Sequence, residues 1–266
     1  MTGIGVFPLF IPDLPAKEKY RSIKDAGFDA VSIYWGDENK YEQLEAAKEY
    51  GLAIDNIHSQ NDNANAIWQD GTDGEERQNV LLSCVEDCAF HNISTVVIHL
   101  TGFPPYPPVS ELGLKRIKEI VCLAEQKNVK LAFENLWTFE HLDTLFEQFP
   151  SPNVGFCYDI GHENLNLHRN CLESYGDKIF ALHINDNFGD GYDAHVLPFD
   201  GTINWNEKMR QLNQCKNIDF FTLEIYKLES GEHEKSCIYN ELSGQEFLNT
   251  AYKKAVKLLK MEGADS

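Results

Sequence analysis

Positive charge is scarce in this sequence of 266 residues. Lysine and arginine together number 23, against 42 aspartates and glutamates, which gives a formal net charge of −19. The five arginines lie far apart, at positions 21, 77, 116, 169 and 210. An acidic surface repels the phosphates of nucleic acids and of anionic lipids at long range. We therefore expect neither nucleic acid nor a membrane as a partner, although a local basic site stays open.

Paired cysteines and long apolar runs are also missing. The seven cysteines are irregularly spaced and form no Cys-x-x-Cys pair, so they do not predict a disulfide framework. Cys84 and Cys88 lie one helical turn apart, and we expect both on the buried face of a helix. No apolar stretch approaches the ~20 residues that a membrane span needs. The start, Met1–Gly5, lacks the basic and apolar regions of a secretion signal, so we expect a cytoplasmic protein.

Short β-rich runs recur along the whole chain, and a helical pattern follows nearly every one. The eight runs are Ile4–Phe7, Phe28–Tyr34, Leu52–Ile57, Ile93–Ile98, Val129–Phe133, Val154–Tyr158, Ile179–Ile184 and Phe220–Ile225. The amphipathic segments lie around residues 15–26, 38–50, 74–91, 110–127, 138–148, 163–175, 205–215 and 243–260. This alternation favours a closed (β/α)8 TIM barrel over an open doubly wound sheet. Since no Gly-x-Gly-x-x-Gly turn or linker interrupts it, we predict one TIM-barrel domain over residues 1–266.

The helical and strand patterns are clear in individual segments. The segment at 110–127 has an apolar face, formed by Leu114, Ile117, Val121 and Ala124. Ser243 is the predicted N-cap of the last helix. Continuously apolar runs such as Thr95–Ile98 are typical of strands covered on both faces. The irregular stretches 59–73, 101–109 and 185–204 are expected as loops on the catalytic face of the barrel.

Polar residues that can bind a metal lie at or near the ends of the later runs. They are His58, His99, Glu134, Asp159, His162, His183 and Glu224. Each alone has an ordinary explanation, because a histidine at a strand end commonly forms hydrogen bonds and a glutamate can pair with a lysine. In a barrel, however, all of them converge on one end. Several carboxylates gathered there raise one another's pKa, and a divalent cation would remove that cost. The sequence therefore predicts a metal site.

Four short motifs resemble the strand ends of the xylose isomerase-like barrel superfamily. They are Glu134-Asn135, Tyr158-Asp159-Ile160-Gly161-His162, His183-Ile184-Asn185-Asp186-Asn187 and Leu223-Glu224-Ile225. The order and spacing of the motifs carry the resemblance, which spans essentially the whole chain. That superfamily includes isomerases and epimerases of sugars and sugar phosphates, and also the endonuclease IV branch.

The resemblance implies a metal-dependent isomerase or epimerase that acts on a small sugar, a sugar phosphate or a related keto-polyol. It implies four ligands of one cation, namely Glu134, Asp159, His183 and Glu224. It also implies that Glu134 and Glu224 exchange a proton at one carbon from opposite faces. Proton removal next to a carbonyl needs a positioned base, and a cation can polarise the carbonyl oxygen. Mostly oxygen ligands with one imidazole favour Mn²⁺ or Mg²⁺, with Co²⁺ and Zn²⁺ as alternatives.

Further residues are expected to contact the substrate. These are His162, His195, Glu140, His58 and His99. The alternative interpretation of Glu140 is an exposed charge in the first turn of a helix. The family's arginine after the histidine of the seventh strand has no counterpart, because Phe188-Gly189-Asp190 stands there. The identity of the sugar therefore stays open. A dimer or tetramer is expected from the family alone.

A rival interpretation comes from the same resemblance. Asp193-Ala194-His195 matches an Asp-x-His of endonuclease IV, and the chain has all nine ligand types of that enzyme's trinuclear zinc centre. The additional metal ligands would be Asp193, His195, His162, His58 and His99. The acidic charge, the absence of a tyrosine from the loop after His58, and the occurrence of Asp-x-His among sugar isomerases favour carbohydrate chemistry over cleavage of abasic DNA. A barrel that binds a sugar or metal without catalysis is a third alternative.

Overall fold

The computed structural model describes residues 3–10, 14–165, 169–215, 218–227 and 237–261. Its eight strands are β1 Gly3–Phe10, β2 Ala30–Tyr34, β3 Ala53–His58, β4 Thr95–Ile98, β5 Lys130–Glu134, β6 Val154–Asp159, β7 Ile179–His183 and β8 Phe220–Tyr226. Its α-helices are α1 Ala16–Ala26, α2 Lys40–Glu49, α3 Thr72–His91, α4 Glu111–Lys127, α5 Glu140–Gln148, α6 Ile160–Leu165, α7 Cys171–Tyr175, α8 Trp205–Leu212 and α9 Gly244–Met261. Two 3₁₀ helices, η1 Ala64–Trp68 and η2 Gly176–Lys178, complete the described elements.

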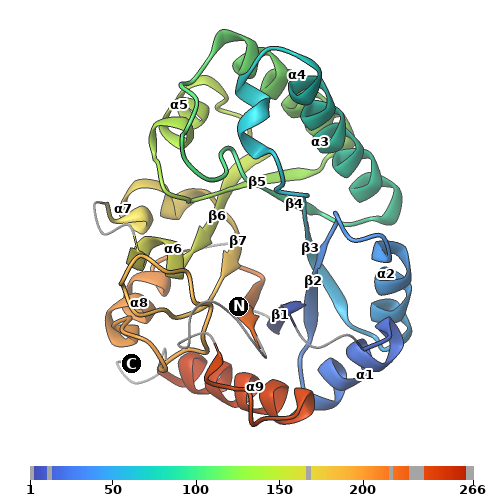
Figure 1. The fold of residues 1–266 in the computed structure, drawn as a ribbon, viewed down its shortest axis with the longest axis vertical. Helices are drawn as coiled ribbons and strands as arrows, with labels where there is room; N and C mark the ends of the chain where they lie inside the picture. The colour runs from blue at the N-terminus through green and yellow to red at the C-terminus, as the bar shows by residue number, and fades with distance from the viewer. Residues whose placement is uncertain (1–2, 11–13, 166–168, 216–217, 228–236, 262–266) are drawn as a thin grey trace.

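The strands form a closed parallel barrel. Neighbouring strands pair in the order β7-β6-β5-β4-β3-β2-β1-β8. The ring closes just beyond the end of β7, where Ile184 N donates to Thr222 O at 2.9 Å and Glu224 N donates to Ile184 O at 3.1 Å. In Figure 1 the strands lie at the centre and the helices surround them. The predicted TIM barrel is thus confirmed. No helix among the described residues has the length and apolar character needed to cross a membrane.

The sequence patterns located most helices correctly. Ser243 caps α9, since its Oγ accepts from Glu246 N at 3.3 Å while its own N donates to Glu246 Oε2 at 2.9 Å. Cys84 and Cys88 are buried in α3, as expected. One prediction was wrong, because the segment at 163–175 is not a single helix. It contains the end of α6 and all of α7, while residues 166–168 lie outside the described part.

The split in that segment has a local cause. Asn170 acts as the N-cap of α7, and its Oδ1 accepts a hydrogen bond from Glu173 N at 3.2 Å. A capping asparagine starts a new helix and disfavours continuation of the previous one. The 59–73 stretch, expected to be irregular, also contains structure, namely η1 and the first residues of α3.

Side chains alternate along the strands and build the barrel interior in layers. Val97, Ala132, Cys157 and Ala181 form a small apolar cluster of their own, separate from the core between strands and helices. Successive strand residues point to opposite faces, so the residues two positions further along point to the same interior. Those residues are His99, Glu134, Asp159 and His183. The small apolar layer is therefore the floor of the polar layer above it.

A polar contact also crosses the interior below Glu224. Thr222 Oγ1 of β8 donates to Asp55 Oδ2 of β3 at 2.6 Å, although β1 and β2 separate these strands around the ring. Gly5 leaves room for this contact, because a Cβ at that position would collide with Thr222 Oγ1. Burial raises the pKa of Asp55 to about 6 from its ordinary value of 3.8. The hydrogen bond from Thr222 and the attraction of His183 act in the opposite direction and lower it, but they are outweighed.

Asp55→Asn is therefore predicted to stabilise the protein at neutral pH. The native state holds a proton on Asp55 up to about pH 6 while the unfolded chain releases it near 3.8, so stability is lost as the pH rises through that window. The asparagine variant avoids this loss, which amounts to about 3 kcal/mol at most. Urea unfolding of both proteins at pH 4 and pH 7 measures the difference. Equal effects of the substitution at the two pH values would contradict the assignment.

Candidate active site and metal centre

Four buried residues from neighbouring strands meet at the carboxyl end of the barrel. Glu134, Asp159 and His183 are the last residues of β5, β6 and β7, and Glu224 lies in β8. One ligand atom of each lies within 4.8 Å of those of the other three. His183 Nδ1 lies 3.1 Å from Glu134 Oε1 and 2.9 Å from Glu224 Oε2. We call these residues the four-residue centre. The sequence placed all four at strand ends, and the fold brings them to one point.

The four-residue centre fits a divalent cation. Its side chains offer three carboxylates and one imidazole, a donor set that suits Mn²⁺ or Mg²⁺. Glu224 Oε2 is buried, and its contact with His183 Nδ1 at 2.9 Å lacks the geometry of a hydrogen bond. A buried carboxylate oxygen without a donor is costly, and a bound cation would remove that cost.

The charges of the centre are strongly coupled. Burial, reinforced by Glu224 and Glu134, raises the pKa of Asp159 to about 7 against the attraction of His162. Burial would also raise the pKa of Glu134, but His183, His99 and His162 hold it well below its usual value. For Glu224, the attraction of His183 and His195 overcomes burial and lowers the pKa to about 2. Protonated histidines therefore provide the compensating positive charge in the protein alone.

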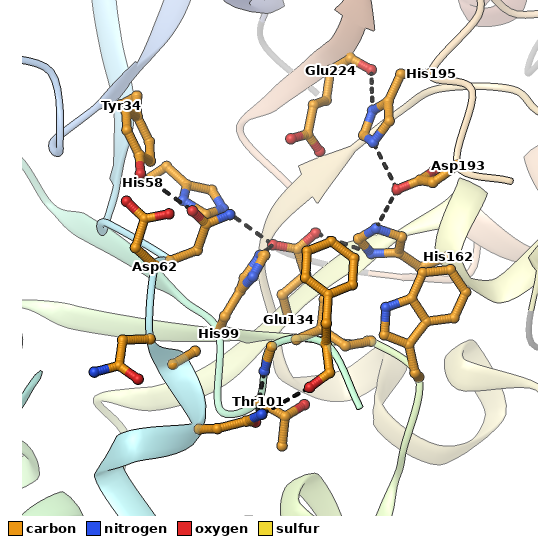
Figure 2. Close-up of a pocket in the computed structure, with 18 of the residues that line it drawn as sticks. Tyr34, His58, Asp62, His99, Thr101, Glu134, His162, Asp193, His195 and Glu224 are labelled. Carbon is orange, nitrogen blue, oxygen red and sulfur yellow. Dashed lines mark hydrogen bonds and ion pairs between the residues drawn. The ribbon is translucent and has the colours of Figure 1, made fainter. Parts of the chain in front are cut away.

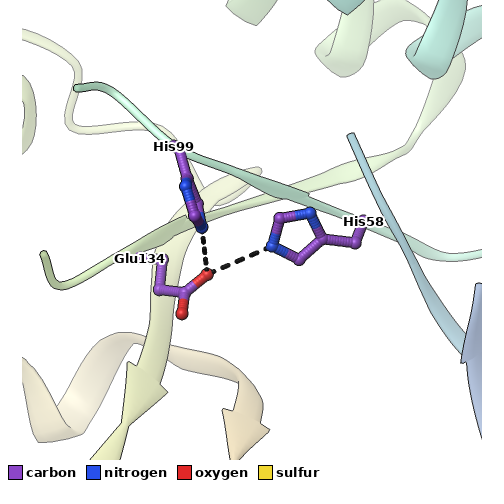
Figure 3. Close-up of side chains that lie close together, drawn as sticks. All are labelled: His58, His99 and Glu134. Atoms are coloured by element: carbon purple, nitrogen blue, oxygen red, sulfur yellow. Dashed lines mark hydrogen bonds and ion pairs between the residues drawn. The ribbon is translucent and has the colours of Figure 1, made fainter. Parts of the chain in front are cut away.

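Two further groups of donors flank the four-residue centre. On one side, His58 Nε2 and His99 Nε2 lie 3.3 Å and 2.8 Å from Glu134 Oε2 (Figure 3). On the other side, His162 Nε2 and His195 Nε2 each lie 2.9 Å from Asp193 Oδ2 (Figure 2).

The hydrogen bonds of three histidines fix which ring nitrogen faces the carboxylates. The Nδ1 atoms of His58, His162 and His195 donate to the backbone oxygens of Ser59, Asn135 and Glu224, respectively, at 2.9, 2.9 and 3.1 Å. When such a ring is neutral, its proton is on Nδ1 and the lone pair of Nε2 points to the centre of the site. This arrangement is common among histidines that bind metals.

The sequence predicted two roles for each flanking histidine, contact with the substrate and binding of an additional metal. Both roles would be played in the same cavity. His58, His99, His162 and His195 line the same cavity as Glu134, where each can contact a substrate or a second cation. Glu140 is different, since it lies at the start of α5 with an exposed side chain and does not line this cavity. Its position agrees with the alternative interpretation, an exposed charge in the first turn of a helix.

Asparagines support the centre in a way that the sequence analysis did not assign. Asn135 Oδ1 accepts from Asp159 N and its Nδ2 donates to Asp159 O, both at 2.8 Å. Asn185 Nδ2 donates to Asp159 Oδ2 at 2.9 Å, and His162 N donates to Asp159 Oδ1 at 2.7 Å. These hydrogen bonds therefore fix the positions of both carboxylate oxygens of Asp159. The only sequence signal was that both asparagines lie within the quoted motifs.

Asp186 positions the loop that carries Asp193 and His195. Its carboxylate accepts from Trp205 Nε1 at 2.9 Å and from Ile203 N at 3.1 Å, and its backbone pairs with Val196. Because these contacts tie both ends of the loop to the end of β7, the Asp193–His195 segment is held over the cavity.

The cavity above these groups has a volume of about 670 Å³, which is within the range of small-molecule sites. Its described lining residues are Tyr34, His58, Asn61, Asp62, Asn63, Ala64, Asn65, His99, Thr101, Gly102, Phe103, Glu134, Leu136, Trp137, His162, Gly191, Tyr192, Asp193, His195, Glu224 and Tyr226. The site can therefore hold a small molecule directly over the buried carboxylates.

Two curated relatives are similar to parts of this chain. A protein of Methanocaldococcus jannaschii, uncharacterized protein MJ1311, is 26% identical over 210 residues, which cover 71% of this chain and 69% of that protein. Uncharacterized protein y4fM of Sinorhizobium fredii is 39% identical over 89 residues, which cover 30% of this chain and 28% of that protein. The chain thus spans less than a third of the second relative.

Solved structures match over almost the whole length. A D-tagatose 3-epimerase-like protein superposes with a TM-score of 0.73 at 18% identity, covering 99% of this chain and 100% of the other. D-psicose 3-epimerase of Clostridium cellulolyticum H10, solved with D-tagatose, gives 0.73 at 14%, with 98% of both chains covered. The IolI protein with a bound zinc atom gives 0.75 at 20%, covering 97% of this chain and 98% of the other. At these identities the likeness establishes the fold.

The family follows from the sequence itself. Residues 20–247 match the family described as the xylose isomerase-like TIM barrel, which is most of the chain. The chain belongs to the xylose isomerase-like TIM barrel family.

Proposed function

We propose that this protein is a metal-dependent isomerase or epimerase of a small carbohydrate. The observation that carries the proposal is the four-residue centre, in which two glutamates from β5 and β8 meet beside Asp159 and His183. A divalent cation bound there would supply a Lewis acid that polarises the substrate carbonyl. The comparisons support the proposal, since structures described as sugar 3-epimerases and a zinc-containing barrel have the same fold.

Glu134 and Glu224 are the proposed proton carriers. His183 Nδ1 lies 3.1 Å from the carboxylate of Glu134 and 2.9 Å from that of Glu224, so the two glutamates are neighbours in the site. One carboxylate removes the proton from the carbon beside the carbonyl, and the other delivers a proton to the opposite face. A positioned base of this kind typically contributes about 10²–10⁴-fold to the rate.

Their surroundings keep both glutamates ionised and separate from bulk water. Both are buried, and nearby histidines keep the pKa of each below its usual value. His162 and His195 line the same cavity and are placed to orient hydroxyl groups.

The seven cysteines are all unbridged, which supports a reducing compartment such as the cytoplasm.

Glu134→Gln and Glu224→Gln are predicted to abolish exchange of the substrate's carbon-bound proton. Each change removes a base and a charge of the centre, so the rate falls by about three orders of magnitude or more. Deuterium incorporation from D₂O into a ketose measures the exchange. Glu147→Gln, an exposed position at the far end of α5, is the matched control and retains wild-type exchange. Retained exchange in either active-site variant would remove that glutamate from the mechanism.

A second candidate function is hydrolysis of a phosphodiester by a centre with three cations. A specific observation favours it, because the groups His58–His99–Glu134 and His162–Asp193–His195 adjoin the four-residue centre. In three of the histidines, Nδ1 is already engaged with a backbone oxygen, which leaves Nε2 for a ligand. The acidic chain and the small number of arginines disfavour a polyanionic substrate.

Metal content separates the two candidates. We predict one tightly bound Mn²⁺ or Mg²⁺ for each chain, because the four-residue centre offers mostly oxygen donors. Elemental analysis of the purified protein gives the ratio, and an incision assay on abasic duplex DNA tests the second activity. Three zinc ions for each chain together with incision would establish the phosphodiesterase. A protein without metal that still exchanges the proton would contradict both.

A further inference from the structure

The walls of the cavity combine carboxylates with histidines. Asp62 and Asp193 add two carboxylates to those of Glu134 and Glu224. Lysine and arginine are absent from the cavity lining, as far as the described residues go. A phosphate ester would place a doubly negative group beside Asp62, where no lysine or arginine of the described lining offsets the repulsion. Hydroxyl groups meet no such repulsion.

The two arginines on this side of the barrel are used for other contacts. Arg77 is buried behind the cavity wall and donates to the backbone oxygens of Gln60 and His99. Arg116 is also buried, and its Nη1 donates to Ile67 O at 3.1 Å. Both guanidinium groups hold loop backbone in place, and neither lines the cavity. They therefore provide no clamp for a phosphate.

The outer wall instead presents amides and an exposed aromatic ring. Residues 61–65, which precede and begin η1, contribute three asparagines and Asp62 to the lining. Asn65 Nδ2 donates to Phe103 O at 2.8 Å and so ties η1 to the next loop. The Phe103 side chain is 82% exposed at the cavity. An apolar face beside neutral hydrogen-bonding groups is suited to a polyhydroxylated molecule.

Asp62 is the charged residue of this outer wall. It lies near Tyr34 and His58 in Figure 2. Its Oδ2 accepts from Gln60 Nε2 at 3.2 Å, and among the described lysines and arginines none forms an ion pair with it. The carboxylate can therefore accept hydrogen bonds from hydroxyl groups of a bound molecule.

We propose that the substrate is a neutral polyhydroxy ketone or aldehyde, and that Asp62 excludes its phosphorylated forms. This inference rests on the proposed isomerase or epimerase function. The reacting carbons lie at the four-residue centre, and the remote end of the substrate lies against residues 61–65 and Phe103. Asp62 accepts from a remote hydroxyl group and repels a phosphate at the same place.

The test compares free ketoses with their terminal phosphates. D-tagatose and D-fructose, each with its 6-phosphate, are assayed with the metal-loaded protein by deuterium incorporation, and kcat/KM is determined. The wild type is expected to prefer the free sugar by at least about tenfold. Asp62→Lys reverses the local charge and is expected to shift the ratio toward the phosphate by at least about tenfold. Glu147→Lys makes the same change of charge at an exposed position of α5 and leaves the ratio unchanged.

The possible outcomes distinguish the proposal of a neutral substrate from the proposed isomerase or epimerase function on which it rests. Equal or better use of the sugar phosphates by the wild type would overturn the neutral substrate and leave the isomerase function standing. An unchanged ratio in Asp62→Lys would overturn the role of Asp62. Absence of exchange with all four compounds, together with incision of abasic DNA, would overturn the proposed function itself.

Discussion

Glu134 carries two carboxylate oxygens that between them contact four histidines. Oε2 lies 3.3 Å from His58 and 2.8 Å from His99, and Oε1 lies 3.3 Å from His162 and 3.1 Å from His183. This carboxylate is buried at the end of β5, so its charge requires compensation from within the barrel. These histidines lie in β3, just after β4, in α6 and in β7, so this one carboxylate connects segments that are far apart in the sequence.

The need to compensate buried carboxylates also determines the charge state of the site. Burial and repulsion from Glu224 and Glu134 raise the pKa of Asp159 to about 7, whereas the attraction of His183 and His195 lowers that of Glu224 to about 2. In the protein alone, protonated histidines balance the charge. A divalent cation would do so with fewer protons and would leave the glutamates free to act as bases. Farther out, Asp62 adds a carboxylate to a described lining without lysine or arginine, which is the basis of the proposed preference for a neutral substrate.

Much of the fold could be predicted because the barrel repeats a local pattern. Eight apolar runs with helical segments between them determine the class, and the strand ends identify the residues that converge. The split between α6 and α7 could not be predicted from periodicity, since it depends on the cap at Asn170. The support that Asn135 and Asn185 give to Asp159 depends on loop conformation, which a residue pattern does not determine. The contact between Asp55 and Thr222 joins positions 167 residues apart and depends on the strand order around the ring.

Anomalous diffraction from crystals grown with Mn²⁺ would locate the cation. We predict one strong peak enclosed by Glu134, Asp159, His183 and Glu224, with ligand atoms at about 2.0–2.3 Å, close to the distances of other divalent cations with such ligands. A peak held by a different set of residues would contradict the proposed centre. So would a map without a peak in which these four side chains point to separate parts of the barrel.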